Sequence, residues 1–170
     1  ILSIFHSILE EGANQYPHLS KLRIILPREN KAPARVLSKD EQSKLIQYLL
    51  KDMDPCKFGT LLALMTGLRI GELCALKWKD ISLKESMLVV SNTMLRLRSQ
   101  NDQGKKTEII ISTPKSLSSV RRIPLSDSIK TLCTLFQVND PEAYILTGRA
   151  YQYIEPRTLQ NIFKRYLQQC

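Results

Sequence analysis

A single arginine, Arg69, lies just beyond the expected end of a helix at Gly67 and is flanked by apolar residues. A guanidinium held between apolar neighbours presents a planar, permanently charged fork that grips two phosphate oxygens, which lysine does less well. Glu72 follows three positions later, on the same side of a helix, and can fix the orientation of that fork. The same spacing is typical of a structural ion pair, and the spacing alone favours the ion pair over a phosphate site.

The net charge of +9 is unevenly distributed along the 170 residues. Residues 94–125 contain seven basic and two acidic residues, so this stretch supplies five of the nine positive charges. Its basic residues are Arg96, Arg98, Lys105, Lys106, Lys115, Arg121 and Arg122. A local positive field of this kind suits a polyanion such as DNA, because each neutralised phosphate releases condensed counterions. A solvated basic hairpin explains the charge equally well.

Composition argues against several other classes of protein. With 43% hydrophobic residues, the chain can build one globular domain and a fragment of a second. No stretch approaches the roughly 20 consecutive apolar residues of a membrane span, and the apolar start lacks the basic leader of a signal peptide. We therefore expect a cytoplasmic protein with no membrane partner. No metal or cofactor is expected either, because the sequence has no phosphate-binding glycine loop and no metal-ligand cluster. The four cysteines are too widely spaced for a metal-binding motif: Cys56, Cys74, Cys133 and Cys170.

The pattern of residues divides the chain into three segments. Residues 1–11 carry an apolar stripe at helical spacing that Gly12 and the residues after it should end, and the first 17 residues provide no core for it. Residues 27–35 contain two prolines and four charges, which is typical of a linker. We assign residues 1–26 to the end of another domain, 27–35 to the linker and 36–170 to the main domain.

Capping residues and apolar periodicity predict the order of elements in the main domain. Ser38 and Glu41 form a capping box at the start of the first helix, and Gly67 should end the second because glycine readily takes the left-handed conformation. The first expected helix runs from the capping box to about residue 52, and two more follow at about 58–65 and at 70–76. Strands are expected at 87–97, 107–112 and 120–125, and further helices at 126–136 and 157–167. The predicted fold class is therefore α+β, mainly helical, with a small antiparallel sheet.

Longer segments resemble a known family. Thr66–Ile81 closely resembles the first arginine box of the tyrosine recombinases, the family of phage and transposon integrases. Thr113–Ser116 followed by Ser119–Leu125 resembles the hairpin that bears the family's catalytic lysine. Tyr144–Gly148 and Pro156–Phe163 resemble spacer segments of integrases from Gram-positive mobile elements. The resemblance runs in order through about residues 35–170, and residues 1–26 resemble the last helix and exit of the family's core-DNA-binding domain.

The resemblance implies a partial tyrosine-recombinase catalytic domain. In that reading Arg69 is a catalytic arginine, Lys115 is the catalytic lysine and Glu72 supports the arginine. In the family a tyrosine hydroxyl attacks a DNA phosphodiester, which forms a 3′-phosphotyrosyl link and releases a 5′-hydroxyl. The hydroxyl of a second strand then attacks this link and rejoins the DNA. Neither step needs a metal or a cofactor. Arginines stabilise the negative charge on the non-bridging oxygens, and the lysine protonates the leaving 5′-oxygen.

Other basic residues border the two matching segments and are predicted to contact the DNA backbone. Such contacts position DNA without reading its sequence, and for each residue a solvated surface position is the alternative. The predicted DNA-binding residues are Lys77, Lys79, Arg96, Arg98, Lys105, Lys106 and Arg121. The partners implied by the resemblance are double-stranded DNA carrying an attachment site and, on that DNA, further copies of the protein in a tetramer.

Two parts of the family's active site have no match in this sequence. The second box, a histidine and an arginine with two residues between them, should follow residues 157–167, and the tyrosine nucleophile should come later. His6 and His18 lie far upstream, and the four later tyrosines lie in spacer segments and are predicted to be packing residues: Tyr144, Tyr151, Tyr153 and Tyr166. We therefore expect a fragment that binds DNA without cleaving it alone. The alternatives are a non-catalytic DNA-binding accessory protein and a structural domain without a nucleic-acid role.

Overall fold

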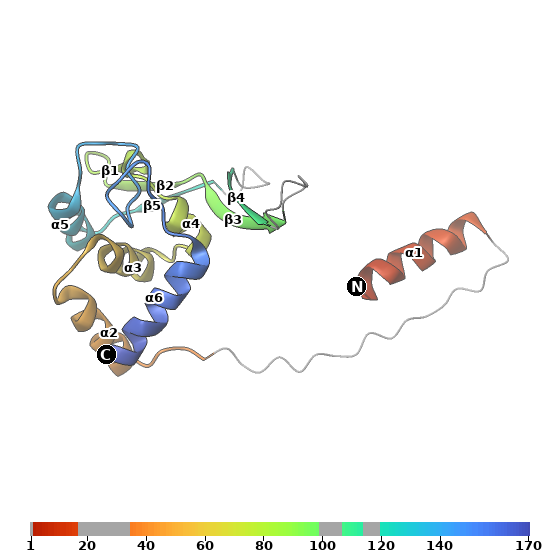
Figure 1. The fold of residues 1–170 in the computed structure, drawn as a ribbon, viewed down its shortest axis with the longest axis horizontal. Helices are drawn as coiled ribbons and strands as arrows, with labels where there is room; N and C mark the ends of the chain where they lie inside the picture. The colour runs from red at the N-terminus through yellow and green to blue at the C-terminus, as the bar shows by residue number, and fades with distance from the viewer. Residues whose placement is uncertain (1, 17–34, 99–106, 114–119) are drawn as a thin grey trace. The chain divides into compact units, whose positions relative to one another are not determined.

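The structure is a computed structural model that describes residues 2–16, 35–98, 107–113 and 120–170 (Figure 1). It divides into two compact units, residues 1–36 and 37–170. The first unit has one described helix, α1 (Leu2–Gln15). The prediction placed the end of this helix at Gly12 and the residues after it; the helix runs through Gly12 to Gln15, and the Tyr16 amide donates to the Gly12 carbonyl at 2.9 Å. One glycine costs a helix only about 1 kcal/mol relative to alanine, which is too little to end it.

The second unit begins with two helices whose ends are set by local side chains. In α2 (Lys39–Leu50) the predicted capping box is present: the Glu41 amide donates to Ser38 Oγ at 3.2 Å and the Ser38 amide to Glu41 Oε2 at 2.9 Å. Helix α3 (Pro55–Thr66) is capped by Asp54. It ends, as predicted, at Gly67, whose φ of +67° is the left-handed conformation that glycine adopts at little cost.

The strands form two separate antiparallel sheets. After α4 (Ile70–Ala75) and a short 3-10 helix η1 (Trp78–Asp80), the strands β1 (Ile81–Ser82), β2 (Met87–Val90) and β5 (Arg121–Pro124) pair in the order β1-β2-β5. Strands β3 (Thr93–Arg98) and β4 (Thr107–Ser112) form a two-stranded ribbon. Figure 1 shows this ribbon extending from the side of the unit that carries α4.

The prediction of one strand over 87–97 was wrong. The chain leaves the ladder at Ser91 and Asn92, where the Asn92 amide group donates to Ser91 Oγ at 3.2 Å. On one side of this break Val90 is paired with Arg121, and on the other Thr93 is paired with Ser112. The two halves of the run pair with different strands, β5 and β4, and this change of partner cannot be read from the local pattern of the residues.

The core lies between the three-stranded sheet and the helices. Phe58 of α3 stacks on Trp78 and on Phe136 of α5 (Asp127–Phe136), with ring centroids 5.9 and 4.9 Å apart. Trp78 is buried in this stack. A second cluster joins α2 and α3 to Tyr166 of α6 (Pro156–Gln169).

The structure confirms the predicted α+β class, with a mainly helical unit and small antiparallel sheets. Among the described residues, none of the helices combines the length and the apolar character needed to span a bilayer.

Candidate functional site

The main chain on either side of Arg69 places its side chain at the surface. Gly67 turns the chain out of α3, Leu68 is buried, and Arg69 is the extended residue immediately before α4, with φ −73° and ψ 151°. The Arg69 side chain is 78% exposed. A buried leucine on one side and a helix start on the other therefore hold the backbone, while the guanidinium faces solvent.

Glu72 is the charged centre of this region. Its carboxylate, only 9% exposed, accepts the Arg69 backbone amide at 2.8 Å and Arg69 Nη1 at 3.1 Å. It also accepts Nη1 and Nη2 of Arg121 at 2.8 and 2.7 Å. These bonds, those from Arg121 foremost and then those from Arg69, lower the pKa of Glu72 to about 2 although burial acts in the opposite direction. Glu72 is therefore ionised at any physiological pH.

The two arginines bind Glu72 differently. Arg121 presents both terminal nitrogens in a bidentate arrangement, and its side chain is 32% exposed. Arg69 gives the carboxylate one terminal nitrogen and its backbone amide. The ion pair expected between Arg69 and Glu72 is present, but sequence reasoning missed Arg121 as a partner. The two residues are 49 positions apart, and no local spacing marks such a contact.

A groove of about 440 Å³ opens beside Arg69, between α4, strand β3 and the start of α6. Arg96 and Arg157 also line it, so three arginines border one cavity. Arg96 is held by an ion pair with Glu155 and donates to Thr107 Oγ1 at 2.7 Å. Glu155, the partner of Arg96, lines the groove as well, so only part of the positive charge of the three arginines is left to make the groove suited to binding an anion.

Gly71 lines this groove and determines how closely α4 can approach β3. A Cβ placed on Gly71 would lie 2.7 Å from Thr93 Oγ1 and 2.8 Å from the backbone oxygen of Met94. A backbone oxygen cannot move aside as a flexible side chain does. The absence of a side chain at Gly71 is therefore what lets Arg69 and Arg96 border the same cavity.

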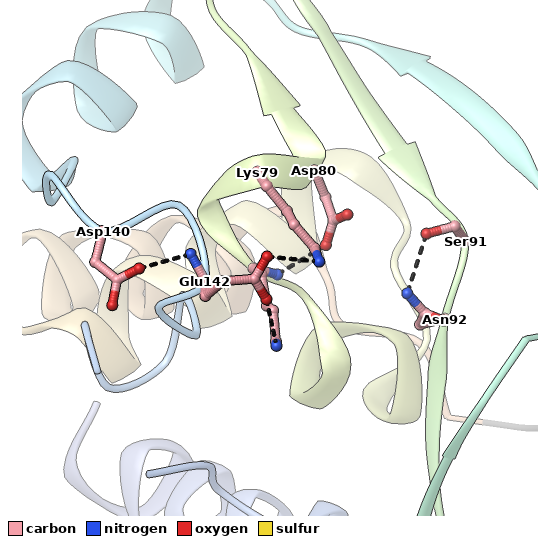
Figure 2. Close-up of polar contacts among 7 residues, drawn as sticks. Lys79, Asp80, Ser91, Asn92, Asp140 and Glu142 are labelled. Carbon is pink, nitrogen blue, oxygen red and sulfur yellow. Dashed lines mark hydrogen bonds and ion pairs between the residues drawn. The ribbon is translucent and has the colours of Figure 1, made fainter. Parts of the chain in front are cut away.

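Lys77 and Lys79, both predicted DNA contacts, share the carboxylate of Glu142 at 2.9 and 2.8 Å. Figure 2 shows Lys79 directed at Glu142, whose backbone amide donates to Asp140 at 2.9 Å. The hydrogen bond to Glu142 raises the pKa of Lys79, and the bonds from Lys79 and Lys77 lower the pKa of Glu142. Both lysines thus have a carboxylate partner on the surface, and their role in DNA binding stays a prediction.

The remaining predicted site residues cannot be placed in this way. Lys105, Lys106 and Lys115 lie outside the described residues, and Arg98 is described only as the last residue of β3. Their roles also stay predictions.

The tyrosines divide into two groups. Tyr144 and Tyr166 are buried, as expected of packing residues, and Tyr153 contacts the Tyr144 ring edge-on with centroids 6.1 Å apart. Tyr151 is 83% exposed, so its prediction as a packing residue was wrong. It lies in an irregular segment after Gly148, where apolar periodicity gives no information about burial. Within the described ranges, no three cysteine, histidine or acidic side chains gather in a way that could hold a metal ion.

Comparison with known protein families gives one extended match. Residues 35–170 match the sequence model of the phage integrase family. Among individual proteins, the chain is 37% identical over 157 residues to tyrosine recombinase XerA of Pyrococcus furiosus, a match that covers 92% of this chain and 47% of XerA. It is 28% identical over 153 residues to a XerC-like tyrosine recombinase of Caldanaerobacter subterraneus, covering 88% of this chain and 39% of that protein.

Solved structures share the fold. The integrase of transposon Tn1549 in complex with transposon right end DNA superimposes with a TM-score of 0.63 at 20% identity, covering 82% of this chain and 46% of that one. The same integrase with a circular intermediate DNA gives a TM-score of 0.71 at 19% identity, covering 96% and 55%. The chain therefore spans less than half of the two curated relatives and about half of these solved chains.

Proposed function

This chain belongs to the phage integrase family, and from that membership we propose that the intact protein is a tyrosine recombinase that cleaves and rejoins DNA at specific sites. The observation that supports a catalytic role for this segment is the Glu72 centre. A buried, ionised carboxylate accepts the backbone amide and one terminal nitrogen of Arg69, while the arginine side chain remains 78% exposed beside a groove that Arg96 and Arg157 also line.

In this proposal Arg69 binds the non-bridging oxygens of the phosphate that is attacked. Its positive charge offsets the negative charge that builds up on those oxygens, and because the side chain is already oriented, little reorganisation is needed during the reaction. Glu72 is the acidic residue that supports it. Lys115 is proposed as the general acid that protonates the leaving 5′-oxygen.

The nucleophile is proposed to be a tyrosine that lies outside these 170 residues, together with the second histidine and arginine box. No segment of the sequence matches either of them. By itself this segment is proposed to bind double-stranded DNA without cutting it, through Lys77, Lys79, Arg96, Arg98, Lys105 and Lys106. The intact protein is proposed to act in the cytoplasm as a tetramer on paired sites.

The proposal is tested by covalent trapping. The intact protein, incubated with DNA carrying its attachment site, should form a protein–DNA adduct that survives denaturing electrophoresis. Arg69→Ala should reduce adduct formation on the order of 100- to 1,000-fold, because a preorganised donor to the reacting oxygens is lost. Arg149→Ala is a matched control, since Arg149 is an arginine of the same unit whose guanidinium bonds only to Gln152, at 3.0 Å, among the described contacts.

Unchanged adduct formation in Arg69→Ala would contradict the catalytic role of Arg69. Salt-dependent binding of the intact protein to duplex DNA with no adduct at any site would instead favour the non-catalytic accessory protein. Absence of any salt-dependent binding would contradict a nucleic-acid role altogether.

A further inference from the structure

Arg121 is unusual among the described basic residues of the second unit because both of its terminal nitrogens are committed to one buried carboxylate. The neighbouring Arg122 on the same strand bonds to Glu85 on the surface, and the two side chains are 60% and 61% exposed. Arg121 and Glu72 are 32% and 9% exposed. Neighbouring arginines of one strand therefore face two different environments, and only one of them reaches the site.

The bond between Arg121 and Glu72 joins two separate elements of the fold. Arg121 is the first residue of β5, where it is paired with Val90 in the three-stranded sheet. Glu72 is in α4, a helix of six residues. Without Arg121, the described polar contacts of the Glu72 carboxylate would all come from Arg69 at the start of its own helix. Arg121 is thus the link between Glu72 and the sheet.

We propose that Arg121 is a positioning residue of the recombinase site: by holding both oxygens of Glu72, it fixes the carboxylate that in turn orients Arg69 toward the groove. This rests on the proposed function of Arg69. It replaces the expectation that Arg121 itself contacts DNA. A phosphate contact would require the guanidinium to turn away from Glu72 and leave a buried carboxylate with one charged partner, which is strongly unfavourable.

The geometry makes this role specific to arginine. A bidentate pair fixes both the distance and the plane of the carboxylate, whereas a lysine ammonium is a point charge that fixes only the distance. Arg69 bonds to the same two oxygens, with its backbone amide at Oε2 and Nη1 at Oε1. Any rotation of the carboxylate therefore changes the direction of the Arg69 fork.

The test uses the intact protein with its attachment-site DNA and separates binding from cleavage. We expect Arg121→Gln to slow single-turnover adduct formation roughly 10- to 100-fold, a range typical of residues that orient another functional side chain without contacting the substrate. The affinity for DNA and its dependence on salt should not change. Arg121→Lys should recover part of the rate. Arg122→Gln is the matched control, since Arg122 lies next in the same strand and is not a predicted DNA contact, and it should leave the cleavage rate unchanged.

A second comparison shows whether Arg121 acts through Glu72. The variants Glu72→Gln, Arg121→Gln and the double variant should slow cleavage by similar factors, because residues that act as one unit are not additive. Factors that multiply in the double variant would overturn the proposal. So would an unchanged rate in Arg121→Gln. If thermal unfolding shows that Arg121→Gln does not fold, the same comparison of cleavage rates is made with Arg121→Lys, Glu72→Gln and their double variant.

Two further outcomes keep this proposal separate from the catalytic one. If Arg121→Gln weakens binding on all DNA sequences and lowers the slope of log affinity against log salt by about one, Arg121 is a phosphate contact and the positioning role is wrong. If the unaltered protein forms no adduct, the proposed function itself fails. An adduct that depends on Arg69 but not on Arg121 would leave the function standing and overturn only this inference.

Discussion

Two carboxylates in the second unit each hold two basic side chains, and they do so in contrasting surroundings. Glu72 is 9% exposed and is bound by Arg69 and Arg121. Glu142 is 50% exposed and is bound by Lys77 and Lys79. The first centre joins the start of a helix to a strand, and the second joins residues 77–79 to a surface turn.

The difference shows what burial and ligand geometry add to an ion pair. Around Glu142, which is half exposed, water screens the charges, so such pairs contribute little to stability. Around Glu72, four hydrogen bonds of 2.7–3.1 Å from planar groups compensate for the loss of water and fix one orientation. A fixed orientation is what a phosphate-binding arginine requires, whereas a surface charge needs only to be nearby.

The largest expected effect is on stability in acid. The pKa of Glu72 is lowered from its ordinary value of 4.5 to about 2, so the unfolded chain takes up this proton at higher pH than the folded one. The stabilisation is fully present above about pH 4.5 and is lost as the pH falls toward 2, and it amounts to about 3 kcal/mol. Urea unfolding from pH 5 to pH 2 should show that Glu72→Gln lacks this part of the acid sensitivity. If the free energy of unfolding falls with pH equally in the two proteins, the folded state does not stabilise the ionised form of Glu72.

A smaller effect is expected from Gly71→Ala, which alters one centre and not the other. The new methyl group meets the backbone oxygen of Met94, so α4 must move away from β3. Such overpacking costs about 2 kcal/mol. The free energy of unfolding should fall by this amount and cleavage by the intact protein should slow, because Glu72 moves with α4. Gly12→Ala is the matched control, since a Cβ at Gly12 meets nothing within 4 Å. A stability equal to that of the unaltered protein would show that α4 and β3 can separate freely.

The smallest effect is expected from Glu142→Gln. Because the carboxylate lies at the surface, its removal should leave the melting temperature unchanged within error. It frees Lys77 and Lys79, so DNA binding should tighten roughly twofold to threefold at low salt and by less at high salt. Titration of duplex DNA at two salt concentrations measures this. A clear loss of thermal stability would contradict the contrast between the two centres.

Features that depend on neighbouring residues were predicted from the sequence. The capping box of Ser38 and Glu41 and the stop at Gly67 each require only a few positions, and both were confirmed. The contact of Arg69 with Glu72 was found in the same way, from a spacing of three.

Features that depend on distant pairing were missed. The break at Ser91 arises because the two halves of the apolar run pair with strands beginning at Arg121 and Thr107, which no local pattern records. The bidentate bond of Arg121 has the same origin, because it exists only once β5 has joined the sheet. The second half of the Glu72 centre was therefore beyond prediction from a single sequence.

The break at Ser91 also has a consequence for the order in which the unit folds. The β3–β4 ribbon is nested inside the β2–β5 pair: Arg98 and Thr107 are separated by eight residues, and Val90 and Arg121 by thirty. Closing the inner pair first shortens the outer loop and lowers the entropy lost when it closes. We therefore expect the inner ribbon to form before the outer pair. The bond from Arg121 to Glu72 joins β5 to α4, so we expect it to form after the inner ribbon.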